Sequence, residues 1–281
     1  MGDDTSIADF VESFWPLDMR FETQDALPFP ECKEDLLTRY NPEVIKRIEQ
    51  LIDQRDEKLN HYVSEGVEEY CEITNLVFQH RMHERWYPGM ALGSRTVLEL
   101  LINYFQTRQE PEILLDLGCG SGMVDIGLLQ RLPTLKKVYA VDISAHALAV
   151  TKENAERKIP GRAHTLQYVQ QDYTSEEFQN YLKEQLPEGA QCILTLFPMG
   201  GVSEVLQYVP QLLHPEGEIL IGTAIRDNEL GFKLPWKQAI EQLQYQHRSV
   251  AYHRGLHCEE GILHKQVTEK TCILLSRMTL Q

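Results

Sequence analysis

The sequence predicts an α/β fold, with a seven-stranded, mainly parallel and doubly wound sheet that follows an N-terminal helical region. From residue 113 onward, short apolar runs alternate with helical segments, and strands separated by helices imply crossovers in a parallel sheet. A glycine-rich turn follows the first of these strands, and the next two strands end at or near an acid. The last two strands have no helix between them, which indicates an antiparallel pair at one edge.

The N-terminal third is expected to be an arm followed by helices. Prolines interrupt the first 40 residues while aromatic side chains there favour burial, so we expect an irregular arm lying on a surface. Asn41, Pro42 and Glu43 then supply an N-cap, a first-turn proline and an acid. Helical spacing continues from about residues 60 to 86 and 93 to 107. We assign residues 1–108 to an arm and helical cap that is a possible homodimer interface, and 109–281 to the α/β domain.

Within the second domain, seven strands and the helices between them follow from the apolar pattern. The expected strands are residues 113–117, 137–142, 165–170, 191–197, 217–223, 245–252 and 271–278. The expected helices are residues 122–131, 145–157, 175–186, 203–213 and 235–243. A loop containing glycine and histidines is expected between the last two strands.

Composition limits the classes of partner. The 281 residues carry a net charge of −15, which argues against a nucleic-acid partner because phosphate binding needs clustered Lys and Arg. No apolar run has the length of a membrane helix, and the acidic N-terminus does not resemble a signal peptide. Six cysteines without a C-x-x-C pair indicate reduced thiols, and no zinc spacing occurs. We therefore expect a cytoplasmic protein without a metal, a membrane or a nucleic-acid partner.

The glycine-rich turn is the feature that points to a ligand. Its glycines tolerate positive φ and carry no Cβ, so bare backbone can approach a ligand at a helix start. An acid at the tip of the second strand can accept hydrogen bonds from a ribose diol. A nicotinamide dehydrogenase is the alternative, but its G-x-G-x-x-G fingerprint needs a glycine where this chain has Met123.

The pattern Asp116-x-Gly118-x-Gly120-x-Gly122, with acids after strands two and three, resembles class I S-adenosylmethionine (SAM)-dependent methyltransferases. The likeness covers roughly residues 110–281. It includes the segment 212–217, which is similar to the family's Leu-Lys-Pro-Gly-Gly turn with a His and a Glu substituted. The resemblance implies SAM as the cofactor.

The resemblance also assigns roles to individual residues. It implies that Asp116 and the turn hold the methionine part of SAM, with Cys119 as a small filler. Asp142 would bind the ribose, and Ile143 would cover an adenine face. Asp172 would contact the adenine amino group, beside Tyr173; as an alternative, Asp142 or Asp172 would only cap a helix. The residues at the tip of strand four would face the transferred methyl group: these are Leu196 and Phe197.

The acceptor is less constrained by the sequence. His80, His83 and His253 are candidate catalytic bases, with solvated surface positions as the alternative. The tip of strand four lacks the Asn/Asp-Pro-Pro-Tyr/Phe motif of amino-group methyltransferases acting on DNA bases or glutamine amides. We therefore expect methyl transfer to a small-molecule acceptor, most simply at oxygen. The alternatives are N-methylation of an amine or peptide, and a non-catalytic protein that binds the cofactor for a partner.

Overall fold

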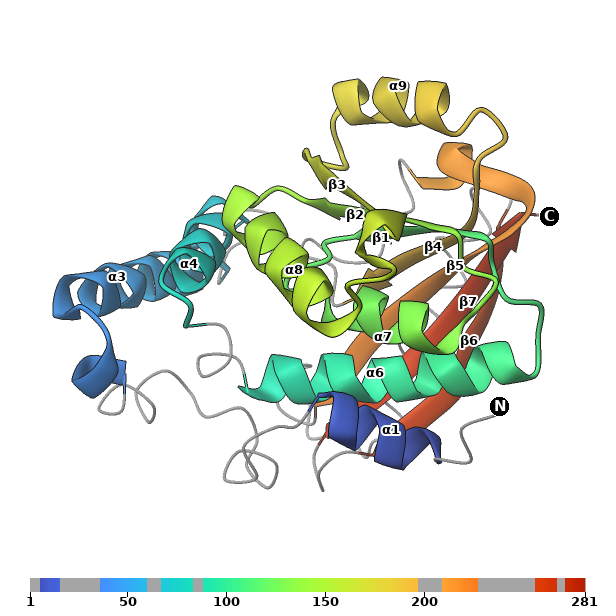
Figure 1. The fold of residues 1–281 in the computed structure, drawn as a ribbon. Coiled ribbons are helices and arrows are strands. Elements are labelled where there is room, and N and C mark those ends of the chain that lie inside the picture. The colour runs from blue at the N-terminus through green and yellow to red at the C-terminus, as the bar shows by residue number, and fades with distance from the viewer. Residues whose placement is uncertain are drawn as a thin grey trace.

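A computed structural model of the chain describes residues 6–15, 36–59, 67–82, 88–196, 209–226, 256–266 and 271–280. Its centre is a mostly parallel sheet with the strand order β3-β2-β1-β4-β5-β7-β6 (Figure 1). The strands are β1 (Ile113–Leu117), β2 (Lys137–Asp142), β3 (Leu166–Gln170), β4 (Ala190–Leu196), β5 (Leu213–Arg226), β6 (Leu256–Gln266) and β7 (Thr271–Leu280). The expected α/β class and antiparallel edge are confirmed, because β7 pairs antiparallel with both β5 and β6.

Helices cover both faces of the sheet. They are α1 (Ile7–Phe14), α3 (Pro42–Leu59), α4 (Val67–Gln79), α6 (Pro88–Gln106), α7 (Met123–Arg131), α8 (Ala145–Lys158) and α9 (Glu176–Gln185), with short 3₁₀ turns η3 (Ala163–Thr165) and η4 (Val209–Leu212). Alternate strand residues face opposite sides: Leu114 packs with α1, α6 and α7, whereas Leu115 packs with α9 and η4. This is the doubly wound arrangement.

The strand order places a topological switch point between β1 and β4. From β1 the chain moves outward through β2 to β3, and it then returns to β4 on the other side of β1. In open α/β sheets, ligands bind outside the carboxyl ends of the strands at such a point. The carboxyl ends of β1, β2 and β3 lie at one edge because these strands pair parallel.

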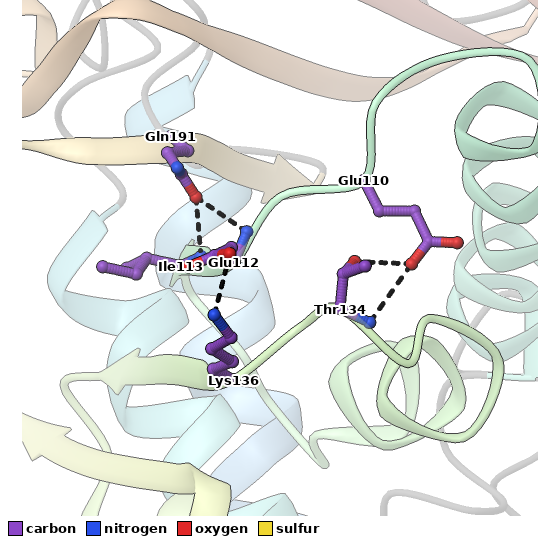
Figure 2. Close-up of polar contacts among 6 residues, drawn as sticks. All are labelled: Glu110, Glu112, Ile113, Thr134, Lys136 and Gln191. Carbon is purple, nitrogen blue, oxygen red and sulfur yellow. Dashed lines mark hydrogen bonds and ion pairs between the residues drawn. The ribbon is translucent and has the colours of Figure 1, made fainter.

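At the opposite edge of the sheet, where the parallel strands begin, side chains hold neighbouring segments together (Figure 2). Gln191 Oε1 accepts the backbone N–H groups of Glu112 at 2.7 Å and Ile113 at 3.1 Å, which joins β4 to the start of β1. Lys136, next to β2, forms a 2.8 Å ion pair with Glu112. Glu110 Oε2 accepts the Thr134 hydroxyl at 2.5 Å. The central strands are therefore anchored at the end away from the switch point.

Two expectations about local structure are wrong. Residues 7–14 form a helix, α1, because Ser6 caps it by accepting the Asp9 amide at 3.1 Å. The aromatics of the arm do pack on the domain: Phe10 and Phe14 contact the core that α6 and α7 form. Most of the expected loop between the last strands is instead β6, whose pairing shifts between Glu259 and Leu263, so a bulge accommodates Gly261.

Several other expected elements lie wholly or partly outside the described residues. The expected strand at 245–252 and helix at 235–243 lie outside the described residues, and of the helix at 203–213 only η4 and the first residue of β5 are described.

The expected start of helix α3 is confirmed, because Asn41 Oδ1 accepts the Glu43 amide at 3.0 Å. Helices α3 and α4 pack as a pair with their own core, and α4 also lies on α8 (Figure 1). No described helix is long and apolar enough to span a bilayer.

Candidate cofactor site

The glycine turn begins at the carboxyl end of β1 and is fastened to β2. Gly118, Gly120 and Gly122 have φ values of 85°, 56° and 67°, in the left-handed region where other residues are strained. The N–H groups of Gly118 and Cys119 both donate to the carbonyl of Val141 at 2.9 Å. A Cβ on Gly118 would meet no atom within 4 Å, so this part of the turn presents open backbone.

Helix α8 holds the turn from behind. The Thr151 hydroxyl donates to the Gly120 carbonyl at 2.8 Å, and Asn154 Nδ2 donates to the Ser121 carbonyl at 3.0 Å. Gly122 sits against the same helix, because a Cβ there would lie 2.2 Å from Thr151 Cγ2. The shape of the turn is thus fixed by two polar side chains of α8 and by the close contact between Gly122 and the same helix.

Asp142 ends β2 and joins the turn to α8. Its Oδ2 accepts the Gly120 amide at 3.0 Å and its Oδ1 accepts the Ser144 amide at 2.8 Å. Burial raises the pKa of this carboxyl, and the backbone donors, from Ser144 first, oppose the rise. Ser144, not Asp142, caps α8. Next to Asp142, Ile143 is 49% exposed, and its apolar side chain is suited to covering a flat apolar ligand.

Asp172 lies beyond β3 at the same edge of the sheet. Its Oδ1 accepts the amide and hydroxyl of Thr174 at 2.8 and 2.7 Å, while Ser175 caps α9. Its carboxylate therefore shapes a turn and remains exposed. Tyr173 is half-buried and packs against the core under α9.

The other predicted residues do not form one cluster among the described residues. Leu196 at the end of β4 packs toward β5, since a Cβ on Gly222 would lie 2.7 Å from its Cδ2. His80 lies half-buried in the turn after α4. Phe197, His83 and His253 lie outside the described residues. The roles given to these five stay predictions.

Two buried carboxyl groups lie behind the turn. Asp116 is 2% exposed, and Asp125, in the first turn of α7, is 0% exposed. Burial raises the pKa of Asp116 to about 7 and that of Asp125 well above its ordinary value, and each of the two carboxyls also acts on the pKa of the other. The neighbouring Cys119 thiol has a raised pKa through burial and the Asp142 charge, so it stays neutral, as expected of a small filler.

Helix α4 reaches the same site. The Phe78 ring tip is 3.7 Å from where a Cβ on Gly120 would lie, and Phe78 packs on Ala147 and Val150 of α8. Burial and the charges of Asp142 and Asp172 raise the pKa of Cys71 on the same helix. An ion pair between Arg81 and Glu153, at 2.7 Å, ties the end of α4 to α8.

Sequence reasoning missed four of these residues. Asp125 had a visible signal, because it is an acid within an apolar helical run, residues 123–129. Thr151 and Asn154 look like ordinary helix residues, and Phe78 lies in a helix whose position on α8 no local pattern gives. Their roles depend on tertiary contacts.

Comparisons with known proteins agree with this geometry. Residues 93–182 match the family described as "Methyltransferase small domain". Ribosomal protein L11 methyltransferases from Psychrobacter sp. (strain PRwf-1) and Thermosynechococcus vestitus are 28% and 30% identical over 144 and 139 residues. These matches cover 50% and 46% of this chain and 44% and 42% of the relatives, so the chain spans less than half of their length.

A solved structure supports the fold. The O-methyltransferase from Bacillus cereus in complex with SAH has a TM-score of 0.51 at 13% identity, covering 66% of this chain and 80% of its own. The comparisons support a class I, Rossmann-like SAM-dependent methyltransferase domain in this chain, with SAM as the cofactor. The buried acids and open glycine backbone fit a cofactor with an ammonium group and a nucleoside.

The expectation of a small-molecule acceptor is contradicted by the same comparison. The matched relatives are named for a ribosomal protein as the acceptor. The apolar tip of β4 favours a small apolar pocket, and this local signal is misleading about the acceptor.

Proposed function

We propose that this protein transfers the methyl group of SAM to a nitrogen of a protein or peptide acceptor. The observation that carries the proposal is the match to relatives named ribosomal protein L11 methyltransferases, joined to a domain with a formed cofactor turn. The net charge of −15 suits a cationic acceptor such as a lysine-bearing segment.

The proposed cofactor contacts follow the edge of the sheet. Asp116 and the open backbone at Gly118 hold the amino-acid end of SAM. Asp142 accepts the ribose hydroxyls, and this is compatible with its existing contacts because each carboxylate oxygen has two lone pairs and accepts one backbone amide. Ile143 covers one adenine face, with Asp172 and Tyr173 nearby.

Methyl transfer from SAM requires the protein side chains mainly to position the acceptor. SAM supplies a methyl group already activated on a sulfonium. The protein aligns the acceptor nitrogen with that methyl group and excludes water. An acceptor amine must lose its proton before attack, and His80 is the described candidate to receive it.

Two measurements test the proposal. Calorimetry should show binding of SAM and of its demethylated product, S-adenosylhomocysteine (SAH), with NAD binding at least about a hundredfold weaker, a gap of nearly 3 kcal/mol. Radiolabelled SAM should then transfer label to ribosomal proteins or to lysine peptides, and not to peptides with acetylated amines. Tight NAD binding, or label found only in the small-molecule fraction of a cell extract, would contradict it.

A further inference from the structure

Within the part of the chain that the structure describes, no hydrogen-bond donor explains why the acid Asp125 is buried. It is fully buried, and neither of its carboxyl oxygens receives a hydrogen bond from a donor group of the described residues. The same holds for Oδ1 of Asp116. An unpaired buried carboxylate costs several kcal/mol, so a group of this kind is expected either to be neutral or to serve a ligand.

The two acids meet each other. Each carboxyl is close enough to the other to act on its pKa. Such a contact is attractive only when one carboxyl carries a proton, since two carboxylates repel. Burial disfavours the charged form of both carboxyls, so the pair is expected to hold a proton. The cofactor contact proposed for Asp116 needs its charged form, and the proton is therefore assigned to Asp125.

Among the described residues, every group whose charge acts on either carboxyl is an acid, and none is a positive side chain. The titratable neighbours come from the turn and from three strands: they are Cys119, Asp142 at the end of β2, Tyr168 on β3 and Cys192 on β4. The thiols and the phenol have raised pKa values, so they are neutral near pH 7. The first turn of α7 adds only the partial positive charge of its amides.

We propose that Asp125 is a positioning residue for SAM, which stays protonated and donates one hydrogen bond to Asp116, so that the Asp116 carboxylate is held as the acceptor of the cofactor's ammonium group. The inference rests on the proposed cofactor site. The proton remains on Asp125, and the ammonium group supplies the cation that the pair lacks. The donated hydrogen bond lowers the pKa of Asp116 and so keeps this residue charged at a lower pH than burial alone would allow.

The test compares donor and donorless variants. SAH affinity is measured by calorimetry between pH 5.5 and 8 for the wild type, Asp125→Leu and Asp125→Asn. In the wild type the affinity should rise with pH as Asp116 ionises. Leucine removes the donor at similar volume, and the midpoint of that rise should move up by about one pH unit, with about tenfold weaker binding at pH 7. Asparagine provides an N–H donor and should restore both the wild-type midpoint and the wild-type affinity at pH 7.

The outcomes separate this inference from the proposed function. If wild-type protein binds no SAH at any pH, the cofactor site itself is wrong. If SAH binds but the leucine variant keeps the wild-type midpoint, or moves it down, Asp125 is not a proton donor to Asp116. If the leucine variant does not fold, infrared difference spectra of the wild type and Asp125→Asn decide: a protonated-carboxyl band at pH 8 that asparagine abolishes supports the inference, and its absence overturns it.

Discussion

At the scale of single residues, Asp142 is the contact whose loss should affect the cofactor most directly. Asp142→Ala removes the acceptor proposed for the ribose hydroxyls, and we expect SAH binding to weaken by about 10- to 100-fold, the value of one or two charge-assisted hydrogen bonds. Calorimetry at pH 7.5 measures it, with the exposed Asp53→Ala on α3 as the matched control. An unchanged affinity in a folded variant would show that the ribose lies elsewhere.

Gly122 offers a test of the turn that needs no ligand. An alanine there would combine a φ of 67° with a Cβ 2.2 Å from Thr151 Cγ2. We expect Gly122→Ala to lower the free energy of unfolding by about 2–4 kcal/mol, from backbone strain and overpacking together. Gly161→Ala is the control, because no atom lies within 4 Å of its Cβ position. Denaturant unfolding that gives equal stability for the two variants would contradict the described turn.

The sequence predicted where the acids and glycines of the site lie, but not the hydrogen bonds that hold the turn in place. Asp116, Gly118 and Asp142 lie where the pattern puts them, because strand ends and turns leave local signals. Thr151 escaped prediction, since its hydroxyl acts across 31 positions on the Gly120 carbonyl. Hydrogen bonds between distant segments depend on how α8 packs, which composition and spacing do not encode locally.

At the scale of elements, α4 should form part of the cofactor site. Because the charges of Asp142 and Asp172 act on Cys71 and Phe78 of the same helix approaches Gly120, bound SAH should slow the reaction of Cys71 with iodoacetamide, by about tenfold if the ligand blocks access in most molecules. Mass spectrometry of the labelled peptide measures the rate, with NAD as the ligand control and Cys71→Ser as the control for the site of labelling. Full SAH binding with an unchanged rate at Cys71 would show that α4 stands clear of the ligand.

Helices were more predictable than the last strands. Apolar spacing identified α3 and α6, and capping residues also marked the start of α3, because both signals are local. Strand β6 escaped prediction because its histidines, glutamates and Gly261 mask alternation, and because a bulge breaks its period. Its pairing with β7 depends on a partner strand at the sheet edge, and sequence alone gives no register there.

At the scale of the whole molecule, the buried acids should make stability fall as pH rises. Their raised pKa values mean that the folded state keeps protons that the unfolded chain releases above about pH 4. Stability is therefore highest in acid and is lost as pH rises, for Asp116 up to about pH 7. Asparagine at position 125 cannot titrate, so the melting temperature of Asp125→Asn should exceed the wild-type value by a margin that grows from pH 5 to pH 8.

A series of thermal melts in buffers of matched ionic strength checks this prediction. The exposed Asp53→Asn on α3 is the control, because its pH dependence should follow the wild type. A margin that shrinks with rising pH would mean that the Asp125 carboxyl is stabilised as an anion in the folded protein.

The bonds from Thr151 and Asn154 to the turn have a consequence for binding rates. Since α8 already fixes the carbonyls of Gly120 and Ser121, the glycine turn loses little conformational entropy when a nucleoside binds. Capture by this loop should need no slow rearrangement, and complex formation in a stopped-flow instrument would then follow a single phase whose rate increases linearly with ligand concentration.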